Sequence, residues 1–302
     1  MRGLLIIFAV VLGAAIYFII SFYFSKLITR KALTSEEAYK IQYDKKLFNV
    51  SRYDSITKEK VEIITKDGLK LNGIYVKGSG SENNTMIFVH GITVSIAWSL
   101  RYMDMFLDRG WNILMYDQRR HGDSDGKYST YGYYEKEDLD EWVNWVVNRN
   151  GRDSIIGLHG ESMGAATVLQ YAPMNKHAFF IIADCPFSDL SKLLKVRLKE
   201  DFRLPPMPML PLSNFRIKRK AKFSIYDIMP IEAVKNSNIP IMFIHGSEDR
   251  FVPCFMSKEL YEAKKDKKKL LIIEGARHAQ SIEVNREGYE KEVMEFIDEI
   301  LF

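Results

Sequence analysis

Short apolar runs recur along this chain, and the polar stretches between them carry apolar residues at helical spacing. Uninterrupted runs of this length are typical of strands buried on both faces of a parallel sheet. The stretches between them, such as residues 137–147 and 290–300, predict amphipathic helices. The strand candidates are residues 61–65, 69–76, 86–89, 112–116, 155–158, 179–183, 241–244 and 270–273.

The first two strand candidates differ from the others in what separates them. Asp67-Gly68 lies between them, and this dipeptide between alternating segments is a strong signal for a β-hairpin. A hairpin followed by repeated strand–helix units predicts an α/β fold with a mostly parallel, eight-stranded sheet and helices on both faces. We expect this domain to span residues 59–302.

One long segment interrupts the alternation of strands and helices. Residues 187–238, after the sixth strand, are too many for a simple crossover, and long insertions in compact domains are usually lids or binding elements. Residues 190–202 predict an amphipathic helix, whereas the proline-rich residues 204–211 cannot form a helix interior. Residues 191–222 contain ten Lys and Arg against Glu200 and Asp201, so the expected lid is strongly basic.

The N-terminus carries a long apolar segment, which begins with Leu4 and ends with Phe24. Its 21 residues are uncharged and would span about 30 Å as a helix, enough to cross a bilayer. A cleaved signal peptide is the alternative, but its apolar region is shorter and ends in small residues. We therefore expect an uncleaved anchor in residues 1–31 and a polar, helical connector in residues 32–58.

Charges around this segment favour one orientation. Lys26, Arg30 and Lys31 follow it and only Arg2 precedes it, so the positive-inside rule favours a cytoplasmic main domain. The predicted location is the cell membrane, with a single N-terminal pass. We expect the anchor to set location and not chemistry, and a chain that begins near Ser51 to keep its active site.

Composition and motifs narrow the possible chemistry. A net charge of +4 with 47% apolar residues describes an ordinary globular protein. The two cysteines, Cys185 and Cys254, form no disulfide framework. The sequence has no phosphate-binding glycine motif and no histidine pair at metal-ligand spacing. We expect no cofactor, no metal site and no nucleic-acid partner.

The chemistry centres on Gly160-x-Ser162-x-Gly164, which follows the strand at 155–158 and precedes a helix at 165–171. A serine on so sharp a turn projects above the sheet, and the flanking glycines leave room for the backbone and for substrate. The following helix directs its N-terminal N–H groups at the same place. Ser162 is therefore the candidate nucleophile.

A nucleophilic serine needs a base, and the base needs an acid to orient it. His278 follows the last strand and Asp249 follows the strand before it, so both are expected at the carboxyl edge of the sheet with Ser162. Asp184, just after the sixth strand, is an alternative acid. The order Ser, Asp, His along the chain separates this arrangement from two other serine hydrolase folds that use the same chemistry.

Two backbone N–H groups are expected to stabilise the oxyanion. One belongs to Met163, next to the nucleophile, and the other to Ile92 in the loop after the third strand. Such donors act where charge develops in the transition state and are each typically worth about 3–4 kcal/mol.

With these residues the chain resembles the serine hydrolases of the α/β-hydrolase fold. It is similar in particular to the bacterial branch grouped with serine aminopeptidase-like, ABHD13-like and ABHD17-like hydrolases, which are often membrane-anchored. Arg120 stands where this family often has glycine, which puts the shape of the pocket in question. The resemblance covers residues 60–300 and rests on His90-Gly91, the 116–124 segment (YDQRRHGDS), Gly160-Glu161-Ser162-Met163-Gly164, Asp249 with Val252-Pro253, and Gly275 with His278.

The predicted reaction is acyl transfer to water. We expect a membrane-anchored hydrolase of esters or thioesters, acting on a small or lipid-like acyl substrate. A serine peptidase and a non-catalytic interaction module of the same fold are the alternatives. The basic lid is a possible second membrane contact, through Lys218, Arg219, Lys220 and Lys222.

Overall fold

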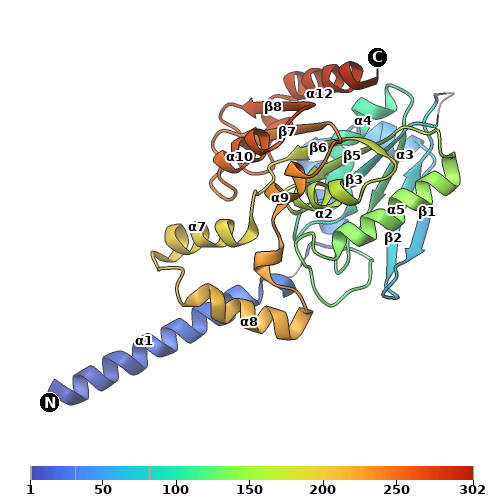
Figure 1. Cartoon of the computed structure of the whole chain (residues 1–302). Helices are drawn as coiled ribbons and strands as arrows, with labels where there is room; N and C mark the ends of the chain where they lie inside the picture. The colour runs from blue at the N-terminus through green and yellow to red at the C-terminus, as the bar shows by residue number, and fades with distance from the viewer. Residues whose placement is uncertain (1, 31, 81–82, 302) are drawn as a thin grey trace.

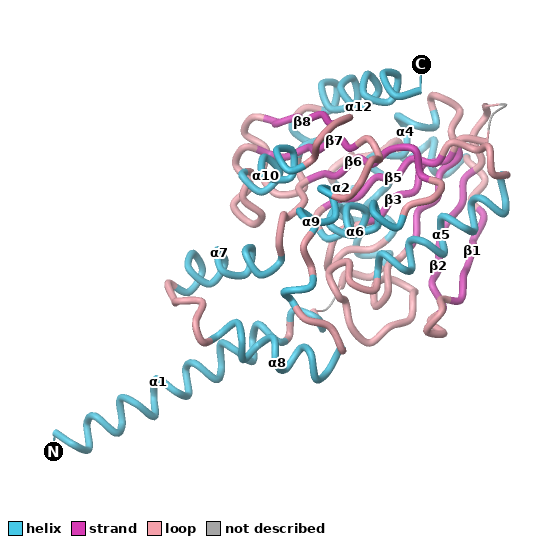
Figure 2. The backbone as a smooth tube through the Cα atoms, in the orientation of Figure 1, coloured by secondary structure: helices cyan, strands magenta, loops and turns pink. Residues whose placement is uncertain are grey.

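The computed structural model describes residues 2–30, 32–80 and 83–301. A single sheet lies between two layers of helices, and one long helix projects away from them (Figures 1 and 2). The strands are β1 (Glu59–Ile64), β2 (Lys70–Val76), β3 (Thr85–Val89), β4 (Asn112–Tyr116), β5 (Ile156–Glu161), β6 (Ala178–Asp184), β7 (Ile241–Gly246) and β8 (Lys268–Ile273).

Helices alternate with most of these strands. The principal ones are α1 (Arg2–Ser25), α2 (Ser35–Asp44), α3 (Val50–Ser55), α4 (Leu100–Leu107), α5 (Glu135–Asn150), α6 (Met163–Tyr171), α7 (Leu190–Phe202), α8 (Met209–Ala221), α9 (Pro230–Lys235), α10 (Phe255–Ala263), α11 (Ser281–Val284) and α12 (Arg286–Leu301). Short 3₁₀ turns complete the described chain at η1 (Leu27–Thr29), η2 (Ile96–Ser99), η3 (Ala172–Met174) and η4 (Ile225–Asp227).

The eight strands follow the order β1-β2-β4-β3-β5-β6-β7-β8 in one sheet. Strand β2 runs antiparallel to both β1 and β4, whereas β3 to β8 pair in parallel. All eight predicted strands are present, which confirms the predicted sheet. The parallel strands bring their carboxyl ends to one edge, where Ser162, Asp249 and His278 follow β5, β7 and β8.

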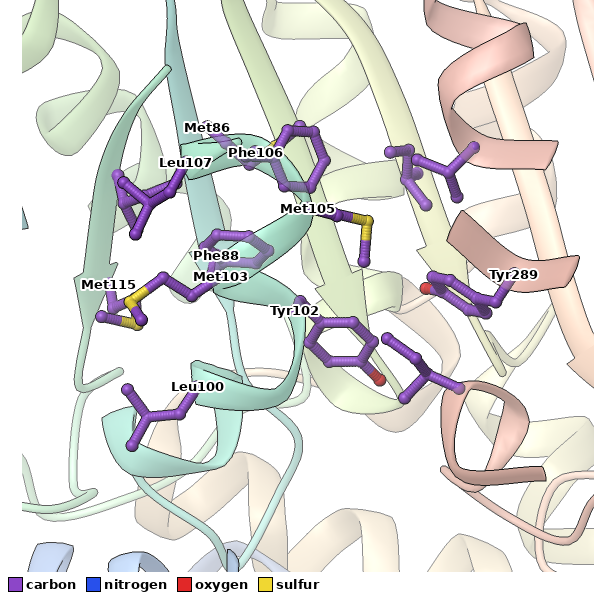
Figure 3. Close-up of a cluster of buried hydrophobic side chains, with 14 of the residues drawn as sticks. Met86, Phe88, Leu100, Tyr102, Met103, Met105, Phe106, Leu107, Met115 and Tyr289 are labelled. Atoms are coloured by element: carbon purple, nitrogen blue, oxygen red, sulfur yellow. The ribbon is translucent and has the colours of Figure 1, made fainter. Parts of the chain in front are cut away.

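The sheet buries one hydrophobic core on each face, because successive strand residues point to opposite sides. Met86 and Phe88 of β3 belong to the core under α4 and α12, whereas Ile87 and Val89 belong to the core under α5 and α6. Figure 3 shows the first core, in which α4 lays Tyr102 and Phe106 over the sheet and Tyr289 of α12 closes one side.

The segment between β6 and β7 carries α7, α8 and α9 at the carboxyl edge of the sheet. Helix α7 has the predicted bounds, and its C-cap Arg203 precedes the proline-rich stretch. Pro211 lies in the first turn of α8, where the missing N–H costs nothing. Both helices belong to a third apolar cluster that also contains Met163 of α6 and Leu27 of η1.

Helix α1 is long and apolar enough to cross a membrane between Leu5 and Tyr23, where its residues are mostly exposed. Its C-terminal half lies alongside α8 (Figure 1). Ser213 of α8 donates a hydrogen bond to the Ser21 carbonyl at 3.1 Å, and the Arg216 guanidinium lies 4.2 Å from the Phe18 ring centroid.

The expected connector forms α2 and α3, and both pack against the domain. Ala38 and Gln42 of α2 are fully buried, and Arg101 of α4 donates to the Gln42 side-chain oxygen at 3.2 Å. Phe48 is also part of the first core. A chain that begins near Ser51 would lose these contacts, and that it keeps its active site stays a prediction.

Candidate active site

Ser162 lies between β5 and α6 in a conformation that residues with a side chain rarely adopt, with φ 55° and ψ −113°. Such a conformation costs on the order of 1–3 kcal/mol and persists only where the surroundings enforce it. Here the Ser162 N–H donates to the Asp184 carbonyl at 2.8 Å, and the Ser162 carbonyl accepts from Ala166 at 3.0 Å.

The two flanking glycines are required by close packing. A Cβ on Gly160 would lie 2.3 Å from the Gly164 carbonyl oxygen, and a Cβ on Gly164 would lie 1.9 Å from the Val89 carbonyl oxygen. Helix α6 therefore begins directly against the end of β3, which places Ser162 beside the loop that follows β3.

The structure brings Ser162, His278 and Asp249 into one hydrogen-bonded chain. The Ser162 Oγ lies 2.9 Å from His278 Nε2, and His278 Nδ1 lies 2.7 Å from Asp249 Oδ2. An ionised Asp249 accepts a hydrogen bond from the Nδ1–H of His278, so the Nε2 lone pair faces the serine hydroxyl. This tautomer is the one that a general base needs.

Several donors keep Asp249 ionised. Burial alone would raise its pKa, but hydrogen bonds with His245 and His278 outweigh burial and hold the pKa of Asp249 well below its usual range. The backbone N–H groups of Phe251 and Val252 each donate to Oδ1 at 2.9 Å. The sequence alone did not identify His245 as a partner of Asp249, although its Nε2 lies 3.2 Å from Asp249 Oδ2. The spacing of four residues between His245 and Asp249 was the signal that could have indicated this contact.

Asp184 lies outside this chain of hydrogen bonds. It is fully buried, and its Oδ1 accepts from Ser281 at 3.1 Å. Burial, with Glu161 nearby, raises the pKa of Asp184 to about 7. Glu161 is also buried and accepts from the Tyr102 hydroxyl at 2.6 Å. Asp184 and Glu161 are therefore buried beside the turn between β5 and α6 that positions Ser162.

The loop after β3 lies against the nucleophile. A Cβ on Gly91 would lie 3.4 Å from Ser162 Cβ. His90 accepts from the Gln118 N–H at its Nε2, 3.1 Å away, so its Nδ1 carries the proton and donates to the Gly91 carbonyl at 2.7 Å. The Ile92 N–H belongs to the same trans peptide and points the opposite way. Burial lowers the pKa of His90 to about 3, which keeps this tautomer neutral.

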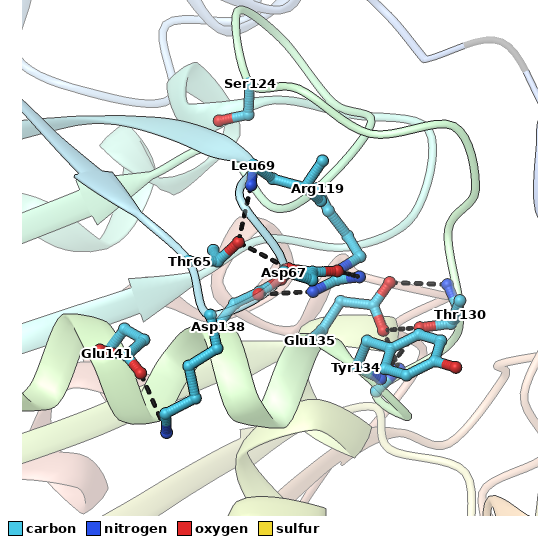
Figure 4. Close-up of polar contacts among 12 residues, drawn as sticks. Thr65, Asp67, Leu69, Arg119, Ser124, Thr130, Tyr134, Glu135, Asp138 and Glu141 are labelled. Carbon is cyan, nitrogen blue, oxygen red and sulfur yellow. Dashed lines mark hydrogen bonds and ion pairs between the residues drawn. The ribbon is translucent and has the colours of Figure 1, made fainter.

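The segment 116–124 supports this loop and does not enter the hydrogen-bonded chain at Ser162. Asp117 accepts from the Ile96 N–H at 2.7 Å, and a Cβ on Gly122 would overlap its carboxylate. Arg119 forms two hydrogen bonds with Asp138, at 2.7 and 2.6 Å, and a third with Asp67 at 3.2 Å (Figure 4). These contacts tie the end of β4 to α5 and to the β1–β2 turn.

Arg120, which the sequence marked as a departure, has φ 68°, in the region that glycine favours. Its guanidinium donates to the Thr29 carbonyl at 2.9 Å. The residue therefore holds the segment that follows α1 and does not fill the space above Ser162.

A pocket of about 590 Å³, including its open mouth, extends from Ser162. Met163 and Ile92 lie beside the serine, and Phe251 packs on the His278 ring with centroids 4.9 Å apart. The wall is largely apolar and comes from the domain, the lid and the end of α1. Its further residues are Tyr23, Leu27, Arg30, Tyr131, Phe187, Leu190, Leu193, Leu194, Arg197, Asp201, Phe202 and Val252.

Among the described residues, one group of His, Cys and carboxylate atoms lies within metal-binding range. Cys185, Asp249 and His278 have ligand atoms within 4.8 Å of one another. Asp249 and His278 already hydrogen bond to each other, and burial raises the pKa of the Cys185 thiol well above its ordinary value. The set is thus better suited to moving a proton than to binding a cation.

The comparisons with known proteins agree with this geometry. Residues 84–205 match the model of the alpha/beta hydrolase fold. The chain is 38% identical to the uncharacterized protein YqkD of Bacillus subtilis, over 89% of this chain and 88% of that one. It is 24% identical to alpha/beta hydrolase domain-containing protein 17B of Xenopus tropicalis, over 75% and 72% of the two chains.

A solved structure gives the same result. The esterase Pf2001 of Pyrococcus furiosus superposes with a TM-score of 0.67 at 27% identity, covering 84% of this chain and 97% of the esterase. The chain therefore belongs to the α/β-hydrolase family, and the predicted fold class is confirmed. Its class of activity is that of a hydrolase.

Proposed function

We propose that this hydrolase is a serine esterase or thioesterase, held at a membrane by α1. The observation that carries the proposal is the unbroken chain from the Ser162 hydroxyl through His278 to Asp249, at the base of an apolar pocket. Ser162 attacks the acyl carbonyl carbon while its proton passes to His278 Nε2. Asp249 holds the ring and stabilises the imidazolium that forms.

The N–H groups of Ile92 and Met163 stabilise the tetrahedral oxyanion in this proposal. Collapse of the intermediate breaks the bond to the leaving alcohol or thiol, which takes the proton from His278. Water then attacks the acyl-enzyme by the same steps in reverse and releases the acid. The orientation of the Gly91–Ile92 peptide, set by His90, supports Ile92 as a donor.

The lining of the pocket favours an acyl substrate over a peptide with a free amine. Asp201 is the one acid among the described residues of the wall, and Arg197 already pairs with it at 2.6 Å. An aminopeptidase needs an available carboxylate for the substrate amine. The charges of Lys26 and Arg30 after α1 support a domain on the cytoplasmic side of the cell membrane.

The experiment is labelling with a fluorophosphonate, together with hydrolysis of p-nitrophenyl esters of graded chain length. We expect the parent protein to be labelled and Ser162→Ala to remain unlabelled with an unchanged unfolding temperature. The kcat of Ser162→Ala should fall by about 10⁴- to 10⁶-fold. Ester hydrolysis by Ser162→Ala at a tenth of the parent rate would rule out Ser162 as the nucleophile.

A further inference from the structure

The wall of the pocket contains residues from a part of the chain that the sequence assigns to anchoring alone. Tyr23 is in the last turns of α1, Leu27 is in η1 and Arg30 follows directly, and all three line the same cavity as Ser162. Leu27 is buried in the third apolar cluster, together with lid residues. The segment 23–30 is thus a structural part of the pocket.

Backbone hydrogen bonds fix this segment to the catalytic domain. The Ile28 carbonyl accepts from the Ser129 N–H at 2.9 Å, and the Thr29 carbonyl accepts from Arg120 at 2.9 Å. Further along, the Leu33 N–H donates to the Thr93 carbonyl at 2.9 Å, one residue from Ile92. The path from α1 into the domain therefore has one defined position relative to Ser162.

The same segment is joined to the lid. The Tyr23 and Phe202 rings meet edge to face with centroids 5.6 Å apart, and both residues line the pocket. Ser25 and Ser21 are buried, and Ser21 bonds to Ser213 of α8. Tyr23 is both the last residue of the apolar span and a residue of the pocket wall. The outer part of the pocket therefore lies at the end of the span.

Arg30 gives this apolar cavity a cation. It is partly exposed and has no ion-pair partner among the described residues, whereas Arg197, the other arginine of the wall, is bound by Glu200 and Asp201. An arginine at the side of an apolar pocket binds phosphate or carboxylate oxygens through charge-assisted hydrogen bonds.

We propose that Tyr23, Leu27 and Arg30 form a substrate-binding element, and that the substrate is a membrane-resident, single-chain acyl ester with an anionic headgroup. The acyl chain enters from the bilayer past Tyr23 and lies against Leu27, and Arg30 binds the headgroup. This inference rests on the proposed function, because it assigns the substrate class of the same site. Hydrolysis breaks the acyl–oxygen bond, and the headgroup leaves as an alcohol that keeps its charge.

The test uses the full-length protein in zwitterionic nanodiscs with three substrates. Two are monoacyl lipids with the same palmitoyl chain, lysophosphatidylglycerol and lysophosphatidylcholine, and the third is p-nitrophenyl acetate. Arg30→Gln should lower kcat/KM for the anionic lipid by about tenfold or more and leave the acetate ester unchanged. Lys26→Gln is the matched control, since it removes a neighbouring cation that does not line the pocket.

Two further variants test the wall itself. Leu27→Trp fills the pocket beside the lid and should lower kcat/KM for both palmitoyl lipids by at least about tenfold relative to the acetate ester. Tyr23→Ala changes a half-exposed position and should also lower kcat/KM for both palmitoyl lipids relative to the acetate ester. It replaces Leu27→Trp in the test if that variant fails to fold. Equal effects of Arg30→Gln and Lys26→Gln on the anionic lipid would overturn the assignment of Arg30. Equal loss with all three substrates in both wall variants would overturn the binding element.

Failure of this inference is separable from failure of the proposed function. If the parent protein is labelled by a fluorophosphonate and hydrolyses the acetate ester, the serine hydrolase assignment stands whatever these variants do. If the parent neither reacts with the label nor hydrolyses any of the three esters, the proposed function and this inference fall together.

Discussion

Two aspartates lie at the carboxyl ends of neighbouring strands of this sheet, and their surroundings shift their pKa values in opposite directions. Asp249 accepts hydrogen bonds from two ring nitrogens and two backbone N–H groups, which stabilise its charge. Asp184 is buried next to Glu161, which disfavours its charge. The residue that stays ionised is the one that touches His278, and this difference favours the predicted Asp249 over the alternative Asp184 as the acid.

The first prediction at this scale concerns the acid. Asp249→Asn should lower kcat for p-nitrophenyl esters by about 10⁴-fold with little change in KM, because an amide can donate to Nδ1 and hold the wrong tautomer. Asp184→Asn is the matched control and should stay within tenfold of the parent. The reverse pattern in the two variants would move the acid to the end of β6.

The second concerns stability and pH. The pKa of Asp184 is about 7 in the folded protein, against an ordinary value near 4 in the unfolded chain. Between these two pKa values, Asp184 is protonated in the folded state and ionised in the unfolded state. The free energy of unfolding therefore decreases as pH rises from about 4 to 7. Asp184→Asn has no titrating group at this position and should not show that loss. Between pH 5 and pH 8, the free energy of unfolding of the parent should therefore fall by about 3 kcal/mol more than that of the variant.

Urea unfolding of both proteins at the two pH values measures this difference, and other titrating groups cancel in the comparison. If the free energy of unfolding changed by the same amount between pH 5 and pH 8 in parent and variant, Asp184 would be ionised in both the folded and the unfolded state.

At the scale of elements, the contacts that hold the loops at the carboxyl edge differ greatly in burial. Arg119 and Asp138 join the end of β4 to α5 with side chains that are 7% and 2% exposed. Lys66 and Glu141 join the β1–β2 turn to the same helix, but Lys66 is 72% exposed. Figure 4 shows Arg119 beside Asp138, with Glu141 further along the same helix. The buried pair cannot lose one partner without leaving a desolvated charge.

The third prediction follows from this contrast. Asp138→Ala should lower the free energy of unfolding by about 3–5 kcal/mol, because the Arg119 guanidinium would be left buried without its main partner. Glu141→Ala is the control and should cost less than about 1 kcal/mol. Chemical denaturation compares the two, and the double change Arg119→Met with Asp138→Leu should recover part of the loss. If Asp138→Ala and Glu141→Ala lowered the free energy of unfolding by similar amounts, the Arg119 guanidinium would be hydrated or paired with another carboxylate when Asp138 is absent.

For the whole molecule, α1, α8 and the domain form a continuous unit, so the lid is held near the end of the apolar span. Helix α8 ends in Lys218, Arg219 and Lys220, and Lys222 caps it; all four side chains are exposed. Phe215 on the same helix is 58% exposed. An amphipathic helix with exposed aromatic and basic residues binds an anionic membrane surface.

The fourth prediction is therefore that anionic lipid orders the lid. In nanodiscs with anionic lipids, amide hydrogen exchange of residues 209–221 should be slower than in zwitterionic ones. Each exposed cation contributes about 1 kcal/mol near an anionic leaflet. Changing Lys218, Arg219, Lys220 and Lys222 together to Gln should remove the difference while exchange in β5 stays the same. Equal exchange in both lipids for the parent would limit the lid to covering the substrate.

Much of this molecule follows from local sequence. The strands are short apolar runs whose burial on both faces admits few polar residues, and the turn around Ser162 needs glycines at 160 and 164 because the backbones approach within contact distance. Both signals depend on neighbours a few residues away. The sheet, the insertion after β6 and the positions of Ser162 and His278 at one edge were therefore predictable.

The tertiary structure was needed wherever a side chain depends on partners far along the chain. An apolar helix has the same hydropathy whether it ends in solvent or against a lid, so the sequence assigned residues 1–31 to anchoring and treated Arg30 as a flanking charge. The contact between Ser21 and Ser213 joins positions 192 residues apart. Likewise, the choice between Asp184 and Asp249 depended on which carboxylate receives donors from other strands, because burial and hydrogen bonding set a pKa and spacing does not.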